Sequence, residues 1–85
     1  MDLENLKEAL DGNELGVHHV SAAEVSNIMS YVNVSLEMDR TTLDYYYSID
    51  VKSLLSSEMP ISDLDDLKKE GWAFSKDGKE LIVYL

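Results

Sequence analysis

The sequence contains no cysteine, which excludes disulfide bonds, thiolate metal ligands and a cysteine nucleophile. It contains no apolar run that approaches the roughly 18 residues of a membrane-spanning helix. Its first residues also lack the basic segment and apolar stretch of a secretion signal. We therefore expect a cytoplasmic protein that makes no membrane contact and folds without covalent cross-links.

Basic residues are scarce. Only 7 Lys and Arg stand against 17 Asp and Glu, which gives a formal net charge of -10 on 85 residues. A surface of this sign repels phosphate groups and attracts basic ones. The composition therefore argues against direct nucleic-acid binding and favours a protein partner with a basic surface.

Catalytic signatures are missing as well. The chain has no glycine-rich phosphate loop, no nucleophile elbow and no metalloprotease histidine pair. His18 and His19 are adjacent, so their side chains point in different directions and do not match a helical metal site. We predict no catalytic residue, no metal site and no cofactor, and hence a non-enzymatic protein.

Apolar residues make up 45% of the chain and are spread along its whole length. This distribution is typical of a folded domain and not of an acidic disordered tail. No linker, repeat or low-complexity segment interrupts it. We expect a single domain over residues 1–85, with one modest core.

Two helices are expected in the N-terminal part. Leucines recur at helical spacing over residues 3–10, ahead of Gly12. A second helix is predicted to begin at Ser21, because Ser21 and Glu24 match a capping box. Its buried side should hold four apolar residues: Val25, Ile28, Met29 and Val32.

A β-hairpin is predicted next. Apolar and polar residues alternate over 32–38 and again over 43–51, with turn residues at 39–42 between them. With a four-residue loop at 39–42, Glu37 lies opposite Asp44 on the solvent-facing side. The segment 52–59 is ambiguous and could form one turn of helix.

A third helix and a second hairpin complete the chain. The helix is predicted from Ser62 to Gly71, because acidic residues in its first turn and lysines in its last turn match the helix dipole. The hairpin follows over 72–85 around a two-residue Asp77–Gly78 loop, which suits a type I′ turn. In this register Phe74 lies opposite Leu81.

The order predicts an α+β fold: two N-terminal helices, then a β-hairpin, a helix and a β-hairpin that together form an antiparallel sheet covered on one face. A winged-helix-like fold is the alternative, in which the third helix reads DNA and the last hairpin is the wing. The three aspartates at the start of that helix argue against this use.

The candidate binding residues are carboxylates and one tyrosine. Tyr46 falls on the polar face of its strand, and an exposed aromatic residue among acids suits recognition of a basic partner. Tyr31, Ile82 and Tyr84 share that face, which must then be covered by the first two helices or by a partner. The predicted partner-binding set is Glu37, Asp39, Asp44, Tyr46, Asp50, Asp63, Asp65 and Asp66.

We therefore expect an acidic interaction module, a small regulator or inhibitor that docks on a basic surface of a larger complex. In one version the protein imitates nucleic acid, with binding that weakens as salt rises. A first alternative is a structural accessory subunit that is bound by apolar contacts of a sheet face or edge. A second alternative is an acidic winged-helix-like regulator.

Overall fold

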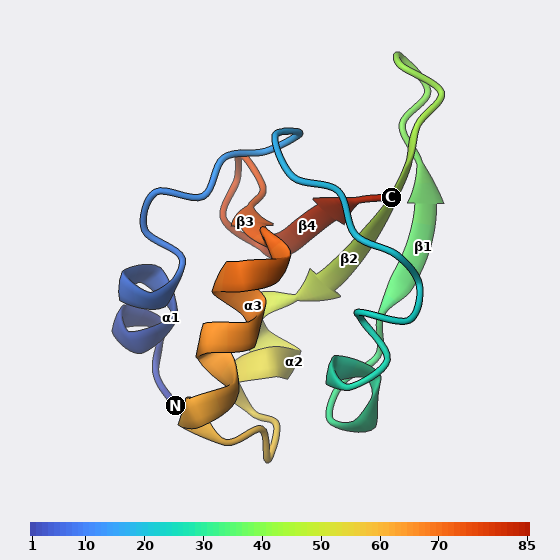
Figure 1. Ribbon diagram of the computed structural model, residues 1–85. Helices are drawn as coiled ribbons and strands as arrows, with labels where there is room; N and C mark the ends of the chain where they lie inside the picture. Colours follow the sequence, from blue (N-terminus) through green and yellow to red (C-terminus); the bar gives the residue numbers. More distant parts are fainter.

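The computed structural model describes residues 1–85 as a small α+β domain with a four-stranded antiparallel sheet and three α-helices (Figure 1). The strands lie in the order β1-β2-β4-β3. The α-helices are α1 (Leu3–Ala9), α2 (Val51–Leu55) and α3 (Leu64–Glu70), and the strands are β1 (Ser35–Met38), β2 (Tyr45–Asp50), β3 (Ala73–Phe74) and β4 (Glu80–Tyr84). The α+β class and the antiparallel sheet are confirmed.

One hydrophobic core lies between the inner face of the sheet and the helices. Leu6 of α1 and Leu67 of α3 are buried against it, and Figure 1 shows these two helices side by side in front of the sheet. Trp72, directly before β3, is fully buried, and its indole N–H donates to a carboxylate oxygen of Glu70 at 3.0 Å. Burial of each large apolar side chain of this kind contributes about 1.5–3 kcal/mol.

The predicted second helix is wrong. Residues 22–27 form turns, and a single 3-10 turn follows at Ile28–Ser30. Half of the capping box is present, because the Ser21 N–H donates to Glu24 Oε1 at 3.0 Å. The segment is rich in serine, asparagine and β-branched residues, which form helices poorly.

Backbone contacts with the sheet also fix the start of this segment. The Val20 N–H donates to the Tyr84 carbonyl at 2.9 Å, and His19 makes a parallel bridge to Tyr84. Val20 and Val25 nevertheless reach the core as buried residues, whereas Met29 is exposed and not buried as predicted. The apolar pattern thus identified most of the buried residues but not the backbone conformation.

The first hairpin has the predicted strands in a different register. Leu36 pairs with Tyr47 and Met38 with Tyr45, two residues away from the predicted pairing. The Asp39 N–H donates to the Asp44 carbonyl at 2.8 Å, so the loop spans 40–43 and not 39–42. A shift of two residues keeps every side chain on its predicted face, which is why alternation alone did not exclude it.

The long alternation over 43–51 ends earlier than predicted. Strand β2 stops at Asp50, and α2 begins at Val51 within the segment whose structure was ambiguous. Asp50 caps this helix, because its carboxylate accepts a hydrogen bond from the Ser53 N–H at 2.9 Å. Val51 is buried all the same.

The second hairpin has the predicted register, with Phe74 opposite Leu81. Its turn is not of type I′, because that type requires a positive φ at Asp77 as well as at Gly78, and only Gly78 has one, +72°. The Gly78 N–H donates to the Ser75 carbonyl at 2.9 Å, and the Asp77 carboxylate accepts from the Lys79 N–H at 3.0 Å. These bonds close a turn that is longer than the predicted two-residue loop.

Helix α3 ends at Gly71, as predicted, with φ +91°. It begins after a 3-10 turn at Ile61–Asp63, so the predicted cap at Ser62 is wrong. The two hairpins form one sheet through the pairing of β2 with β4. The winged-helix-like alternative matches the order of α3 and the last hairpin, but its expected second N-terminal helix is missing.

Candidate functional site

A row of polar side chains crosses the outer face of the sheet. The registers place Glu37 of β1 beside Tyr46 of β2, and Tyr46 beside Tyr84 of β4. The Tyr46 hydroxyl donates to Glu37 Oε2 at 3.0 Å, and the Tyr84 hydroxyl donates to Asp39 Oδ2 at 3.2 Å. We call these four residues the tyrosine–carboxylate cluster: Glu37, Asp39, Tyr46 and Tyr84.

The two tyrosine rings of the cluster pack at a tilt, with centroids 5.5 Å apart and planes inclined by 51°. This arrangement is one of the favoured geometries for aromatic pairs. The His19 ring lies 6.4 Å from the Tyr84 ring, and its Nδ1 donates to the Leu85 backbone oxygen at 2.6 Å. The cluster is therefore held by contacts from three strands and from the segment before Val20.

Hydrogen bonds, burial and nearby negative charge raise the pKa of both tyrosines in the cluster. The hydrogen bond to Glu37, then burial and nearby negative charge, raise the pKa of Tyr46. Burial, followed by the hydrogen bond to Asp39, raises the pKa of Tyr84. The backbone N–H groups of Thr41 and Thr42 lower the pKa of Asp39. The two hydroxyls thus donate to the carboxylates of Glu37 and Asp39, an arrangement that holds these carboxylates in place.

Glu37 does not lie opposite Asp44, so the predicted pair of facing carboxylates is wrong. Tyr46 takes that place because of the register shift. Asp44 is exposed beside the loop, and its negative charge contributes to the raised pKa of Tyr84. Asp44 therefore belongs to the same end of the hairpin as the cluster.

The inner face of this hairpin carries apolar side chains that the core does not cover. They begin at Leu36, opposite the buried Tyr47, and continue toward the loop. Leu85 joins them through its N–H, which donates to the Tyr45 carbonyl at 3.1 Å. We call the hairpin from Leu36 to Tyr45 the arm. Its exposed apolar side chains on this face, with that of Leu85, retain about half of their surface: Leu36 56%, Met38 44%, Tyr45 54% and Leu85 42%.

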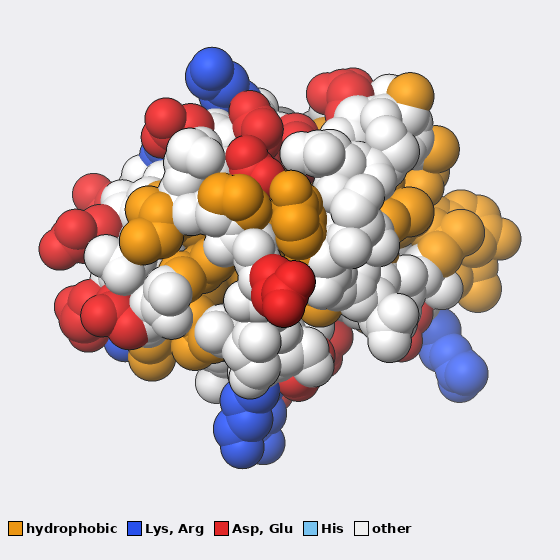
Figure 2. All heavy atoms as spheres, turned by 90° about the horizontal axis from the view of Figure 1, so that it is seen from below, with side chains coloured by type: hydrophobic (Ala, Val, Ile, Leu, Met, Phe, Trp, Pro, Cys, Tyr) orange, Lys and Arg blue, Asp and Glu red, His pale blue; other side chains and the backbone are white.

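Both pictures show the exposed position of the arm. In Figure 1 the loop of the hairpin extends away from the helices. Figure 2, seen from below, shows hydrophobic side chains gathered on the right-hand side of the molecule, the side on which β1 lies in Figure 1. Leu43 in the loop is exposed too. Apolar patches of this kind commonly mark protein interaction sites.

The remaining predicted residues lie elsewhere. Asp50 is engaged as the cap of α2, and its hydrogen bonds to the N–H and hydroxyl of Ser53 lower its pKa. Asp63, Asp65 and Asp66 stand at the start of α3, which packs on the inner face of the sheet. The structure therefore brings Glu37, Asp39, Asp44 and Tyr46 to one end of the hairpin, and separates the helix carboxylates from them.

One acidic residue that the sequence did not single out is Glu70. It is partly buried at the end of α3, where its carboxylate accepts the hydrogen bond from Trp72. Burial, and then the negative charges of Asp66 and Glu24, raise its pKa. Glu24 is distant from Glu70 in the sequence and acts on it only through the fold, so no local sequence pattern identifies Glu70.

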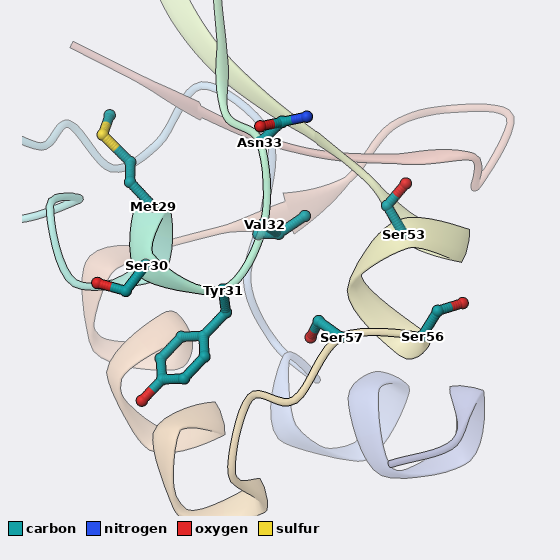
Figure 3. A pocket seen from close by; sticks show the side chains of 8 residues that line it. All are labelled: Met29, Ser30, Tyr31, Val32, Asn33, Ser53, Ser56 and Ser57. Carbon is teal, nitrogen blue, oxygen red and sulfur yellow. The ribbon is translucent and has the colours of Figure 1, made fainter.

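An open hollow of about 520 Å³ lies between residues 29–33 and the end of α2 (Figure 3). Its polar groups are mostly hydroxyls, and those of Ser56 and Ser57 already donate to helix carbonyls at 2.9 and 2.7 Å. Figure 3 shows the Tyr31 ring directed away from these serines. No nucleophile and base converge in this hollow.

Histidines and carboxylates form no group of three or more that could hold a metal ion. No helix has both the length and the apolar character needed to cross a membrane. Comparison with models of protein families, with curated proteins and with solved structures finds no match to this chain. The functional proposal therefore rests on the geometry of the arm and of the tyrosine–carboxylate cluster.

Proposed function

We propose that this protein is a non-enzymatic interaction module, a small regulator or inhibitor, whose arm docks on a basic surface of a protein partner. The observation that supports this best is the meeting of two surfaces on one hairpin. Its inner face exposes Leu36, Met38 and Tyr45, and its outer face carries carboxylates held by tyrosines. Interfaces combine these features, with an apolar centre and a charged rim.

The fixed carboxylates favour a basic partner. Hydrogen bonds from Tyr46 and Tyr84 hold Glu37 and Asp39 before binding, so less side-chain entropy is lost when a Lys or Arg pairs with them. The net charge of -10 adds long-range attraction, which speeds association and weakens as salt rises. Tyrosine is also enriched among residues that dominate binding energy.

Imitation of nucleic acid is the narrower version of this proposal. It draws on charge density alone, and the carboxylates of α3 lie on the other side of the sheet from the cluster. A protein partner that reads only the arm needs no such continuous track of charge. We therefore favour docking through the arm.

A structural accessory subunit, bound by apolar contacts, is the second candidate. The exposed apolar side chains of the arm favour it, because burial of Leu36, Met38, Tyr45 and Leu85 by a permanent partner would be stabilising. Salt separates the two candidates. Binding of a basic partner weakens at high ionic strength, whereas apolar binding survives it.

The experiment isolates partners from native extract and measures the affinity of each purified partner at about 0.05 and about 0.5 M salt. The test variant carries Glu37→Gln with Asp44→Asn, and the matched control carries Asp65→Asn with Asp66→Asn. Both remove the same charge. We expect the arm variant to weaken binding about ten-fold at low salt, and the α3 variant less than about two-fold.

Two outcomes would contradict the proposal. Equal weakening by both double variants would place the interface elsewhere. Affinity that is unchanged between the two salt concentrations would favour the accessory subunit. Both variants retain amide oxygens that accept hydrogen bonds, so the hairpin should stay folded, which circular dichroism checks.

A further inference from the structure

The backbone of β1 has one unpaired side. In the sheet order β1 has β2 as its only neighbour, and all four of its residues are exposed. The Asp39 N–H donates to the Asp44 carbonyl on β2's side of the hairpin. In an antiparallel ladder every second residue has its backbone N–H and C=O on the same side, so those of Glu37 also point toward β2. Leu36 and Met38 must then direct their N–H and C=O groups outward.

The pairing on the far side of β2 agrees with this assignment. The Leu85 N–H donates to the Tyr45 carbonyl, and the Val51 N–H donates to the Lys79 carbonyl. The backbone groups of odd-numbered residues in β2 therefore bond to β4. Those of even-numbered residues, such as Tyr46, bond to β1. Their partners in β1 are Glu37 and its alternate neighbours, as the register requires.

Edge strands are usually protected by proline, by charged side chains such as lysine, by a bulge or by a cover. The sequence of β1, Ser-Leu-Glu-Met, holds no proline and no lysine, and its register with β2 runs without a bulge. Its one charged side chain, Glu37, repels acidic neighbours and attracts basic ones. The opposite edge differs. There β3 is only two residues long, and His19 covers the next part of β4 by bridging to Tyr84.

Side chains define what could lie beside β1. On the inner face a neighbour would meet Leu36 and Met38, which are apolar and exposed. On the outer face it would meet Ser35 and Glu37, with Asp39 held nearby by Tyr84. Because side chains of a strand alternate between faces, the best complement alternates between apolar and basic residues.

We propose that β1 binds an extended segment of a partner protein, in which apolar residues alternate with Lys or Arg, as a fifth strand of the sheet. This inference rests on the proposed function and adds the binding mode. Main-chain hydrogen bonds to Leu36 and Met38 supply affinity, and the two rows of side chains supply specificity. A second copy of the chain is disfavoured, because it would bring another net charge of -10 and a second Glu37 to the same edge.

The test uses three labelled synthetic heptapeptides and the full chain. One peptide alternates Lys and Val, the second has the same composition in two blocks, and the third alternates Glu and Val. We expect the alternating Lys–Val peptide to bind at least about ten-fold more tightly than either of the others. Amide shifts in NMR spectra should be largest at Ser35–Met38.

Two variants separate backbone pairing from side-chain contact. Leu36→Pro removes an outward N–H that has no partner in the sheet, and Leu36→Ala removes the side chain alone. We expect the proline variant to weaken peptide binding about ten-fold and the alanine variant about three-fold. A thermal melt of each free variant shows whether the hairpin is intact.

The outcomes distinguish the binding mode from the function. Equal binding of the alternating and block peptides would overturn strand addition and leave docking on a basic partner standing. Equal weakening by the proline and alanine variants would overturn it too. Dimers of the free protein in sedimentation, abolished by Leu36→Pro, would show that a second copy occupies the edge and would also overturn it. If the double variant at Glu37 and Asp44 leaves partner binding unchanged, the proposed function itself fails.

Discussion

The two hairpins of this protein follow the same alternating pattern but differ in how far their inner-face side chains are buried. In the β3–β4 hairpin the inner residues Leu81 and Val83 are almost fully buried under the helices. In the β1–β2 hairpin the inner residues Leu36 and Tyr45 stay more than half exposed. Alternation thus predicts which face of a strand is apolar. Whether that face is covered depends on where the helices end.

The difference separates stability from binding. The covered hairpin joins the core around Trp72, and any loss there leaves a cavity. The arm adds little to the core, so its apolar side chains have no structural reason to be large. Substitutions on the two hairpins should therefore differ in their effect on stability.

Truncation of one leucine on each hairpin compares them directly. Leu81→Ala should lower the free energy of unfolding by about 2–5 kcal/mol, because Leu81 is 0% exposed. Leu36→Ala, at 56% exposure on the same sheet face, should cost about 0.5 kcal/mol or less. Urea unfolding of both variants measures this, and similar losses at the two positions would contradict the division.

A glycine at the entry to the covered hairpin gives the next effect. Gly71 has φ +91°, and an added Cβ would lie 2.2 Å from the His18 Cβ. Gly71→Ala should therefore cost about 1–3 kcal/mol. Gly16→Ala is the matched control, since Gly16 has φ +77° with no atom within 4 Å of an added Cβ. Equal melting temperatures of the two variants would show that the contact with His18 is unimportant.

The raised pKa of Glu70 should make the free energy of unfolding depend on pH. Burial raises its pKa, so the folded state binds a proton more tightly than the unfolded state. The stability that this group contributes is present below its unfolded pKa and is lost as pH rises through the folded pKa. Glu70→Gln keeps an oxygen for the Trp72 N–H and removes the charge, so it should flatten this fall. An unchanged pH profile in urea unfolding would contradict the assignment.

The smallest expected effect is a change in the pKa of Tyr46 in the β1–β2 hairpin. Glu37→Ala removes the acceptor and charge that raise the pKa of Tyr46, which should move toward the ordinary value of about 10. Tyr84 bonds to Asp39 instead, so its pKa should change less. Below its unfolded pKa Tyr46 contributes its full stabilisation, and this is lost as pH rises through the raised pKa. NMR titration of both rings measures the shifts, and equal shifts would contradict the pairing.

Local sequence patterns correctly predicted the helix end and the turn that require a glycine with positive φ. Gly71 ends α3 and Gly78 closes the last turn, because their positive φ values suit glycine. The first hairpin was misregistered by two residues, since a slip of two keeps each face intact and only the hydrogen bonds of Asp39 select the loop. The second helix was predicted from Ser21 and Glu24, whose hydrogen bond forms without a helix.

The candidate site was predicted in part. Tyr46 and its neighbouring carboxylates follow from alternation along one hairpin. The hydrogen bond of Tyr84 to Asp39 spans 45 positions of the chain, and it depends on the pairing of β2 with β4, which no local pattern encodes. Glu70 was missed for the same reason, because a tertiary contact creates its environment.

Hydrogen exchange of individual amides measures whether β1 offers an open edge to a partner strand. In the free protein the Leu36 and Met38 amides should exchange rapidly while the Glu37 amide, directed toward β2, is protected. Saturation with the alternating Lys–Val peptide should then protect Leu36 and Met38. Protection of these two amides in the free protein, or none with the peptide bound, would contradict the account.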